Sequence, residues 1–155
     1  MQPTIVEGDL LDQRVSVIVN AWNRNVIPWW LLLPQGVSGA IKRRGGTRPF
    51  SELGWRSLPL GTARLTSAGR LPFEAIIHVA AIDLVWRASV SSVAKSVEAA
   101  MALVDSHRFS SVAFPVLGAG SGGLDEAVAL EVMIATLARV ESQAQITLVK
   151  FRPGR

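Results

Sequence analysis

The feature that most constrains the fold is an alternation of strand-like and helix-like segments along the chain. Strands are predicted where β-branched residues cluster, and helices where apolar residues recur every three or four positions. The predicted strands are 4–7, 15–20, 62–66, 75–81, 111–117 and 145–151, and the predicted helices are 37–44, 89–106 and 126–140. Such alternation predicts an α/β domain, with a largely parallel central sheet and helices on both faces.

Length and composition further restrict the class of protein to which this chain can belong. The chain has 155 residues, 49% of them hydrophobic and 18% charged, which predicts one globular domain. It has no cysteine, so disulfides, thiolate metal sites and cysteine nucleophiles are excluded. No segment resembles a secretory signal, and the apolar run 26–33 is far shorter than the about 20 residues of a membrane span. We therefore expect a cytoplasmic monomer with no membrane partner.

The charge balance favours an anionic partner. The net charge is +4, which suits a nucleotide diphosphate and also nucleic acid. The basic residues are scattered apart from Lys42, Arg43 and Arg44, which are predicted to lie on a solvated helix end. Nucleic acid therefore stays an alternative but is not favoured. The two histidines, His78 and His107, are far apart in the sequence, so no metal site is expected.

Two loops are predicted to form the ligand site, because ligands of parallel sheets bind beyond the carboxyl ends of the strands. They are 21–36 and the glycine loop, which consists of Gly118, Ala119, Gly120, Ser121, Gly122 and Gly123. Glycines between a strand and a helix let backbone N–H groups approach a phosphate. A Rossmann dinucleotide site is rejected, since only one helix and one strand follow the loop and that strand has no carboxylate.

Three segments in chain order resemble the macrodomain family. They are Glu7-Gly8-Asp9-Leu10, Asn20-Ala21-Trp22-Asn23 and the run from Gln35 to Ile41. Further landmarks match at Leu65-Thr66, Leu71-Pro72 and Ile76-Ile77-His78, so the resemblance covers nearly the whole chain. It implies a single macrodomain over residues 1–155, with a three-layer α/β/α sandwich and a mixed, largely parallel sheet. The ligand that it implies is ADP-ribose, free or attached to a protein.

The resemblance also implies roles for individual residues. Asp9, beside Leu10, corresponds to the carboxylate that accepts a hydrogen bond from the adenine amino group; a turn or helix cap is its alternative. Asn20 corresponds to the residue that ties the first loop to the scaffold, and Asn23 to the amide that bonds the distal ribose. Phe151 corresponds to an adenine-stacking aromatic, or belongs to the core. The expected pyrophosphate-binding residues are Gln35, Gly36, Val37 and Ser38 on one side and Gly118, Ala119, Gly120, Ser121, Gly122 and Gly123 on the other.

Several positions depart from the family pattern. Ser38 stands where many hydrolytic members carry an aspartate, and a serine hydroxyl is no general base at neutral pH unless it is activated. Pro34 and Gln35 replace loop glycines, and Gln35 offers a side-chain amide in exchange for the lost N–H. Asp125 resembles the aspartate of macrodomains that deglycosylate glutamate or DNA bases, but it also suits a helix N-cap.

The apolar segment that holds Trp29 and Trp30 is predicted to wall the distal ribose pocket, to meet a partner or to fold onto the core.

The resulting hypothesis is an ADP-ribosyl hydrolase that removes mono-ADP-ribose from proteins at glutamate or aspartate esters. Asn23 and Asp125 are the candidate catalytic residues, and no metal or cofactor is expected. A pocket without a strong base would act by orienting the ribose and a water molecule. The alternatives are a non-catalytic reader of ADP-ribose, a deacetylase of O-acetyl-ADP-ribose, and a nucleic-acid-binding protein.

Overall fold

A six-stranded sheet forms the centre of the molecule in a computed structural model, which describes residues 2–23, 36–54, 58–82, 88–119 and 123–152. The strand order is β1-β6-β5-β2-β4-β3. The strands are β1 (Thr4–Gly8), β2 (Val17–Asn23), β3 (Ala63–Thr66), β4 (Ala75–Ile82), β5 (Ser111–Pro115) and β6 (Gln145–Phe151). Only β3 pairs antiparallel with its neighbour among the described pairings, so the sheet is mixed but largely parallel, as expected.

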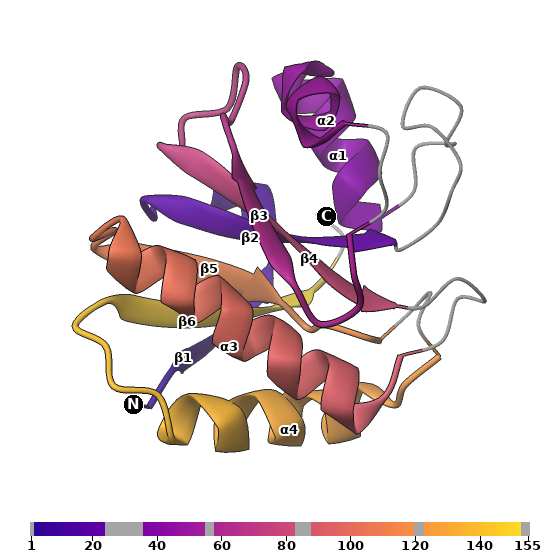
Figure 1. The fold of residues 1–155 in the computed structure, drawn as a ribbon, viewed down its shortest axis with the longest axis vertical. Coiled ribbons are helices and arrows are strands. Elements are labelled where there is room, and N and C mark those ends of the chain that lie inside the picture. The colour runs from indigo at the N-terminus through magenta and orange to yellow at the C-terminus, as the bar shows by residue number, and fades with distance from the viewer. Residues whose placement is uncertain (1, 24–35, 55–57, 83–87, 120–122, 153–155) are drawn as a thin grey trace.

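Helices cover both faces of this sheet (Figure 1). The helices are α1 (Gly36–Gly45), α2 (Arg48–Leu53), α3 (Val90–Ser106) and α4 (Glu126–Ala138), with a short 3-10 helix η1 (Leu10–Asp12) after β1. Helices α3 and α4 pack on one face, while α1 and α2 pack on the other. The three-layer α/β/α sandwich predicted from the sequence is therefore the observed architecture.

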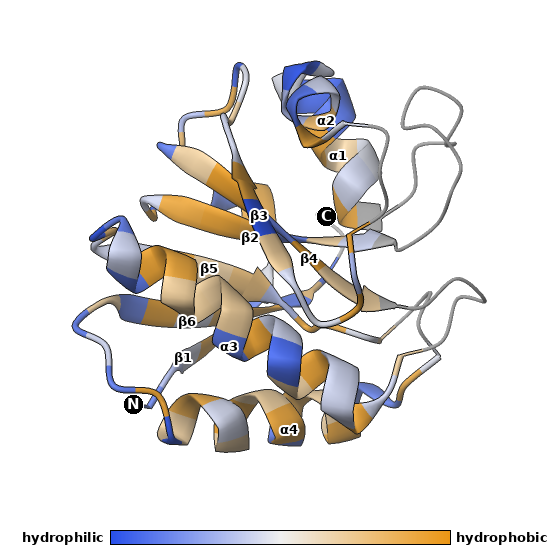
Figure 2. Ribbon diagram, viewed as in Figure 1, coloured by the Kyte–Doolittle hydropathy of each residue, from blue (hydrophilic) through white to orange (hydrophobic). Residues whose placement is uncertain are grey.

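Two hydrophobic cores form, one on each face of the sheet, because successive side chains of a strand point to opposite faces. In β2, Val17 and Val19 belong to the core under α3 and α4, which we call the first core. Ile18 and Trp22 belong to the second core, together with Phe50 of α2. Figure 2 shows the central strands as largely hydrophobic, as expected for a sheet that is buried on both faces.

Local sequence signals explain where the helices begin and end. Ser89 caps α3 in a reciprocal capping box with Ser92. Asp125 caps α4, with its Oδ1 accepting from the backbone N–H groups of Ala127 and Val128. Helix α1 ends at Gly45, and Gly46 follows with a φ of 86°, a conformation that glycine adopts without steric cost.

The structure also differs from the sequence-based expectation at several points. Strand β2 begins two residues later and runs three residues further than expected, so that Asn23 ends the strand. Strand β5 ends at Pro115 and α4 at Ala138, both earlier than expected. Helices η1 and α2 were not predicted, because each is too short to show a periodic apolar face. None of the helices in the described ranges is both long and apolar enough to cross a membrane.

Candidate ligand-binding edge of the sheet

The carboxyl ends of the parallel strands lie along one edge of the sheet and bring the predicted site residues to it. Gly8 pairs with Phe151 across β1 and β6, so that Asp9 follows directly beside the end of β6. Strand β2 ends at Asn23 and β5 leads through Pro115 into the glycine loop. Residues separated by more than a hundred positions in the sequence therefore share one edge, where ligands of parallel sheets bind.

Asp9 forms the turn after β1 and is held on two sides. Its Oδ1 accepts a hydrogen bond of 2.9 Å from the backbone N–H of Leu11, which makes it the N-cap of η1. Its Oδ2 lies 3.8 Å from Arg44 at the end of α1, and Arg44 also donates to Asp12. The capping role considered for Asp9 is confirmed, and the second carboxylate oxygen lies on the side of α1. The side chain of neighbouring Leu10 is buried in the second core, so only its backbone can face a ligand.

Asn20 joins strand β2 to the amino end of α1, while its expected role in tying the first loop to the scaffold stays a prediction. Its side chain is completely buried, and its Oδ1 accepts a hydrogen bond of 3.0 Å from the hydroxyl of Ser38. Ser38 lies in the first turn of α1, directly after Gly36 and Val37. The bond therefore holds the amino end of α1 against β2. It also places the Ser38 hydroxyl in a structural contact.

The pairing of β2 with β4 shifts by one residue just before the end of β2. Ala21 pairs with Val79, whereas Asn23 pairs with Ile82. Such irregularities are common beside active sites, where they change the direction of the chain. The backbone of Asn23 thus leaves the sheet at an irregular point of the ligand edge.

His78 lies in β4 directly beside Asn20 of β2, and its ring makes structural contacts. Its Nδ1 is 3.0 Å from the Nδ2 of Asn20, and its Nε2 is 2.8 Å from the hydroxyl of Thr66. Burial lowers the pKa of His78 to about 3; Glu52 raises this pKa somewhat and the nearby Arg64 lowers it. The imidazole is therefore neutral at physiological pH and does not act as an acid in the site.

The described ends of the glycine loop connect β5 to α4. Gly118 has a φ of 84°, and a Cβ at this position would lie 2.9 Å from side-chain atoms of both Ala88 and Val93. The residue must therefore be a glycine for two reasons, conformation and space. The carbonyl of Gly118 accepts from the N–H of Leu124, which closes the turn before Asp125. Ala119 and Gly123 are also described, while Gly120, Ser121 and Gly122 lie outside the described residues.

Phe151 ends β6 and is not part of the core, because 63% of its surface is exposed. Its two neighbours in the sequence form ion pairs: Lys150 lies 3.8 Å from Glu126, and Arg152 lies 3.6 Å from both Glu126 and Glu7. These ion pairs connect β6, β1 and the beginning of α4. Of the two interpretations of Phe151, the core is wrong, and the stacking role stays a prediction.

Several predicted features of the first loop cannot be placed in the described ranges. Gln35, Pro34 and the segment with Trp29 and Trp30 lie outside the described residues. The described ranges contain no group of three acidic, histidine or cysteine side chains that would hold a metal ion.

Sequence analysis did not identify the contacts that Thr66 makes with His78, Glu52 with Ser67, and Arg44 with Asp9. Nothing in the local pattern around them indicates their partners, which lie on other elements.

The order of the strands and the two strand-to-helix junctions at the carboxyl edge define an α/β/α sandwich of the macrodomain class. The Macro domain family model matches residues 19–133. This chain belongs to the Macro domain family.

Relatives and solved structures support the same assignment. The O-acetyl-ADP-ribose deacetylase of Escherichia coli K12 is 33% identical over 142 residues, which cover 86% of this chain and 76% of that protein. A macro domain-containing protein of Listeria monocytogenes is 33% identical over 161 residues, with 97% and 86% covered. An Oceanobacillus iheyensis macrodomain solved with ADP superposes with a TM-score of 0.79 at 25% identity, with 97% of this chain and 85% of that chain covered.

Proposed function

We propose that this chain binds ADP-ribose and removes mono-ADP-ribose from modified proteins, at the esters that join the distal ribose to glutamate or aspartate. The observation that carries the proposal is the 3.0 Å bond from Ser38 to Asn20, which holds the amino end of α1 against β2, three residues before the strand ends at Asn23. This arrangement offers a phosphate-binding helix end next to the residue expected to orient the distal ribose.

The binding part of the proposal follows from the geometry of the edge. The first backbone N–H groups of a helix have no partner within the helix, and the helix dipole makes this end positive. Gly36 and Val37 supply such groups in α1. A pyrophosphate would lie between them and the glycine loop. Asp9 would then bond the adenine from the end of β1, and Phe151 would stack on it.

The catalytic part follows from the state of the polar side chains. The Ser38 hydroxyl donates to Asn20, and His78 is buried and neutral. Asp9 and Asp125 each cap a helix. A site of this kind favours a labile bond, which is cleaved when the ribose and a water molecule are held in the correct geometry. An ester is such a bond, and the substrate phosphate would help to orient the water.

A second candidate function is the deacetylation of O-acetyl-ADP-ribose. It is supported by the names of relatives that are 31% to 33% identical to this chain, from Klebsiella pneumoniae and Escherichia coli. The two reactions share an ester on ADP-ribose and differ in the acyl group, which is a protein carboxyl in one case and acetate in the other. The same pocket would serve both.

Nucleic-acid binding is supported less well. Two of the three clustered cations of α1 are engaged within the protein: Arg44 pairs with Asp12, and Lys42 lies 4.8 Å from the ring centre of Phe50. A surface that binds phosphates along a nucleic acid needs several cations directed outward.

The test is a comparison of substrates that differ only in the linkage to ADP-ribose. The chain is incubated with proteins modified at glutamate, serine or arginine, with ADP-ribosylated DNA, and with O-acetyl-ADP-ribose, and the products are separated. We expect release from glutamate-modified protein and none from the serine or arginine linkages. Turnover of O-acetyl-ADP-ribose alone would favour the second function, and tight binding without turnover of any substrate would identify a reader.

A further inference from the structure

A chain of hydrogen bonds, buried at its centre, runs from α1 across β2 and β4 to the end of β3. The Ser38 hydroxyl bonds to Oδ1 of Asn20 at 3.0 Å, and Nδ2 of Asn20 to Nδ1 of His78 at 3.0 Å. Nε2 of His78 bonds to the Thr66 hydroxyl at 2.8 Å, and this hydroxyl bonds to the Ser67 carbonyl at 3.0 Å. We call this series the relay. It connects the first turn of α1 with β2, β4 and β3.

The donors of the relay have only one consistent direction. The amide Nδ2 of Asn20 is a donor, so Nδ1 of His78 must be the unprotonated, accepting nitrogen. The proton of the neutral ring is then on Nε2, which donates to the Thr66 hydroxyl, and that hydroxyl donates to the Ser67 carbonyl. At the other end, the Asn20 carbonyl oxygen is left to accept from Ser38. Reversal of the His78 tautomer would set two donors against each other.

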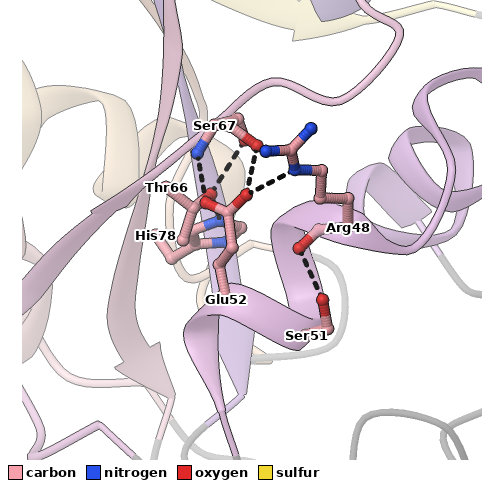
Figure 3. Close-up of polar contacts among 6 residues, drawn as sticks. All are labelled: Arg48, Ser51, Glu52, Thr66, Ser67 and His78. Atoms are coloured by element: carbon pink, nitrogen blue, oxygen red, sulfur yellow. Dashed lines mark hydrogen bonds and ion pairs between the residues drawn. The ribbon is translucent and has the colours of Figure 1, made fainter.

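The surroundings hold the central members in place. Asn20 and His78 are completely buried, and the ring of Phe50 contacts His78 edge-on at 5.6 Å between centroids. The outer end is fixed by Glu52 of α2, which accepts from the backbone N–H of Ser67 at 2.8 Å and from its hydroxyl at 2.6 Å (Figure 3). Arg48 donates to the same carboxylate (Figure 3).

We propose that His78 is a positioning residue for the ligand site, acting through Asn20 on the first turn of α1. By accepting from the Asn20 amide, Nδ1 of His78 fixes the amide orientation in which Oδ1 faces Ser38. Ser38 then keeps Gly36 and Val37 at the position where a phosphate would bind. The proposal rests on the proposed function, since it assigns His78 to the phosphate-binding end of that site.

Two substitutions of His78 distinguish the roles of its two ring nitrogens, because each keeps only one of the two hydrogen bonds. In His78→Asn, the side-chain oxygen can occupy the place of Nδ1 and accept from Asn20, while the contact with Thr66 is lost. In His78→Gln, the longer side chain can place its amide near the position of Nε2 and keep Thr66, while the Asn20 amide loses its acceptor. Both remove the ring contact with Phe50, so the pair is matched for packing. Thr66→Val removes the outer hydroxyl and leaves the inner contacts intact.

The measurement is the Kd for ADP-ribose by calorimetry, together with the Tm of each variant. A buried donor without a partner destabilises the arrangement that it supports, so we expect His78→Gln to weaken binding about tenfold or more. We expect His78→Asn and Thr66→Val to stay within about threefold of the wild type, whatever their Tm. Equal losses for the asparagine and glutamine variants would overturn the proposal, because a purely structural histidine would not distinguish them.

A second readout does not depend on ligand binding. Nitrogen-15 NMR of the wild type should show His78 with Nδ1 unprotonated and the proton on Nε2. The amide resonances of Val37 and Ser38 should move further in His78→Gln than in His78→Asn. A protonated Nδ1, or unmoved amide resonances in His78→Gln, would contradict the proposal even if the protein binds no ADP-ribose. A correct relay without ligand binding would instead refute the proposed function alone.

Discussion

At the residue scale, the most informative position is Asn20, a buried amide on the second-core face of β2. Its neighbours on that face, Ile18 and Trp22, are apolar. A buried amide without partners would cost about 1–3 kcal/mol, so its presence requires the bonds to Ser38 and His78. The family resemblance implied a scaffold role for Asn20. The sequence did not predict that Asn20 and His78 bond each other, because they are 58 positions apart and no local pattern joins them.

The buried state of His78 predicts how stability depends on pH. The pKa is about 3 in the folded chain and 6.5 in an exposed histidine, so between these values the unfolded state binds more protons. The free energy of unfolding should therefore fall as the pH falls from 6.5 toward 3, by up to about 1.4 kcal/mol per pH unit. Urea unfolding of the wild type and His78→Asn at pH 7 and pH 5 measures this.

In that comparison, the wild type should lose more stability than the variant, since carboxylates contribute alike to both proteins. An identical pH dependence of the two proteins would mean that His78 titrates normally when folded.

Asn23 should matter more to turnover than Ser38. Asn23 is expected to orient the distal ribose, whereas Ser38 acts through Asn20 on backbone groups that remain after mutation. Asn23→Ala should lower kcat/KM by about tenfold or more, on the order of 1.4 kcal/mol of transition-state stabilisation. Ser38→Ala should keep most of kcat and mainly raise KM. Steady-state kinetics with the best substrate, on variants shown to be folded, decide the point. An inactive Ser38→Ala beside an active Asn23→Ala would move the chemistry onto α1.

Asp9 should distinguish ligands with adenine from those without it. In Asp9→Asn, the remaining oxygen can still cap η1, while an amide replaces the acceptor expected for adenine. This variant should weaken ADP-ribose by roughly 1.5–3 kcal/mol, the range for a charged hydrogen bond, and leave ribose 5-phosphate unchanged. Calorimetry with both ligands provides the test, and equal losses would mean that Asp9 supports the turn only.

At the scale of elements, the long periodic segments were predictable and the short ones were not. The strand β6 and the helix α3 agree with the expectation almost to the residue, because their apolar patterns are long. Helix α2 has only six residues, with Pro49 in its first turn, so its three buried side chains span too short a segment to show a repeated period. The end of β2 extended into the expected loop because pairing with β4 stabilises it beyond the β-branched run. Tertiary pairing of this kind has no signal in the local sequence.

The cap of α4 allows the two interpretations of Asp125 to be separated. Asparagine caps helices about as well as aspartate, so Asp125→Asn should keep the Tm, whereas Asp125→Ala should lose about 1 kcal/mol of stability. We expect Asp125→Asn also to keep kcat, since both backbone bonds go to one oxygen of a side chain that serves as a cap. Thermal unfolding and kinetics of the two variants give the answer. A stable but inactive Asp125→Asn would make Asp125 a catalytic residue.

At the scale of the whole molecule, the two faces of the sheet differ in what they contain. The first core, under α3 and α4, contains the long apolar helices, while the relay runs through the second core under α1 and α2. The ligand edge receives residues from both sides, with Ser38 from α1 and Asp125 from α4. The overall class could be predicted because alternation of strands and helices permits few arrangements. That Asp9, Asn23 and the glycine loop lie along one edge of the sheet could be predicted because the parallel strands before them end together; their role in binding stays a prediction.

Free ADP-ribose should bind the folded chain and raise its Tm. A ligand that binds only the folded state adds about 2.7 kcal/mol at a hundredfold excess over Kd, which corresponds to several degrees for a chain of this size. Thermal unfolding with ADP-ribose, ADP and ribose 5-phosphate at millimolar concentration measures the effect. ADP-ribose should give the largest shift. If none of the three ligands produces a shift or heat of binding, the chain has the fold without the binding function.

The crowded position of Gly118 has a consequence for building hybrid proteins. At the start of the glycine loop, Gly118 lies against Ala88, just before α3, and against Val93, in the first turns of α3, with no room for a side chain between them. A glycine loop transplanted from another member of the family would have to pack on Ala88 and Val93 with a backbone that differs from the one they contact here. Exchange of substrate preference by recombination should therefore succeed only when the segment before α3 travels with the loop.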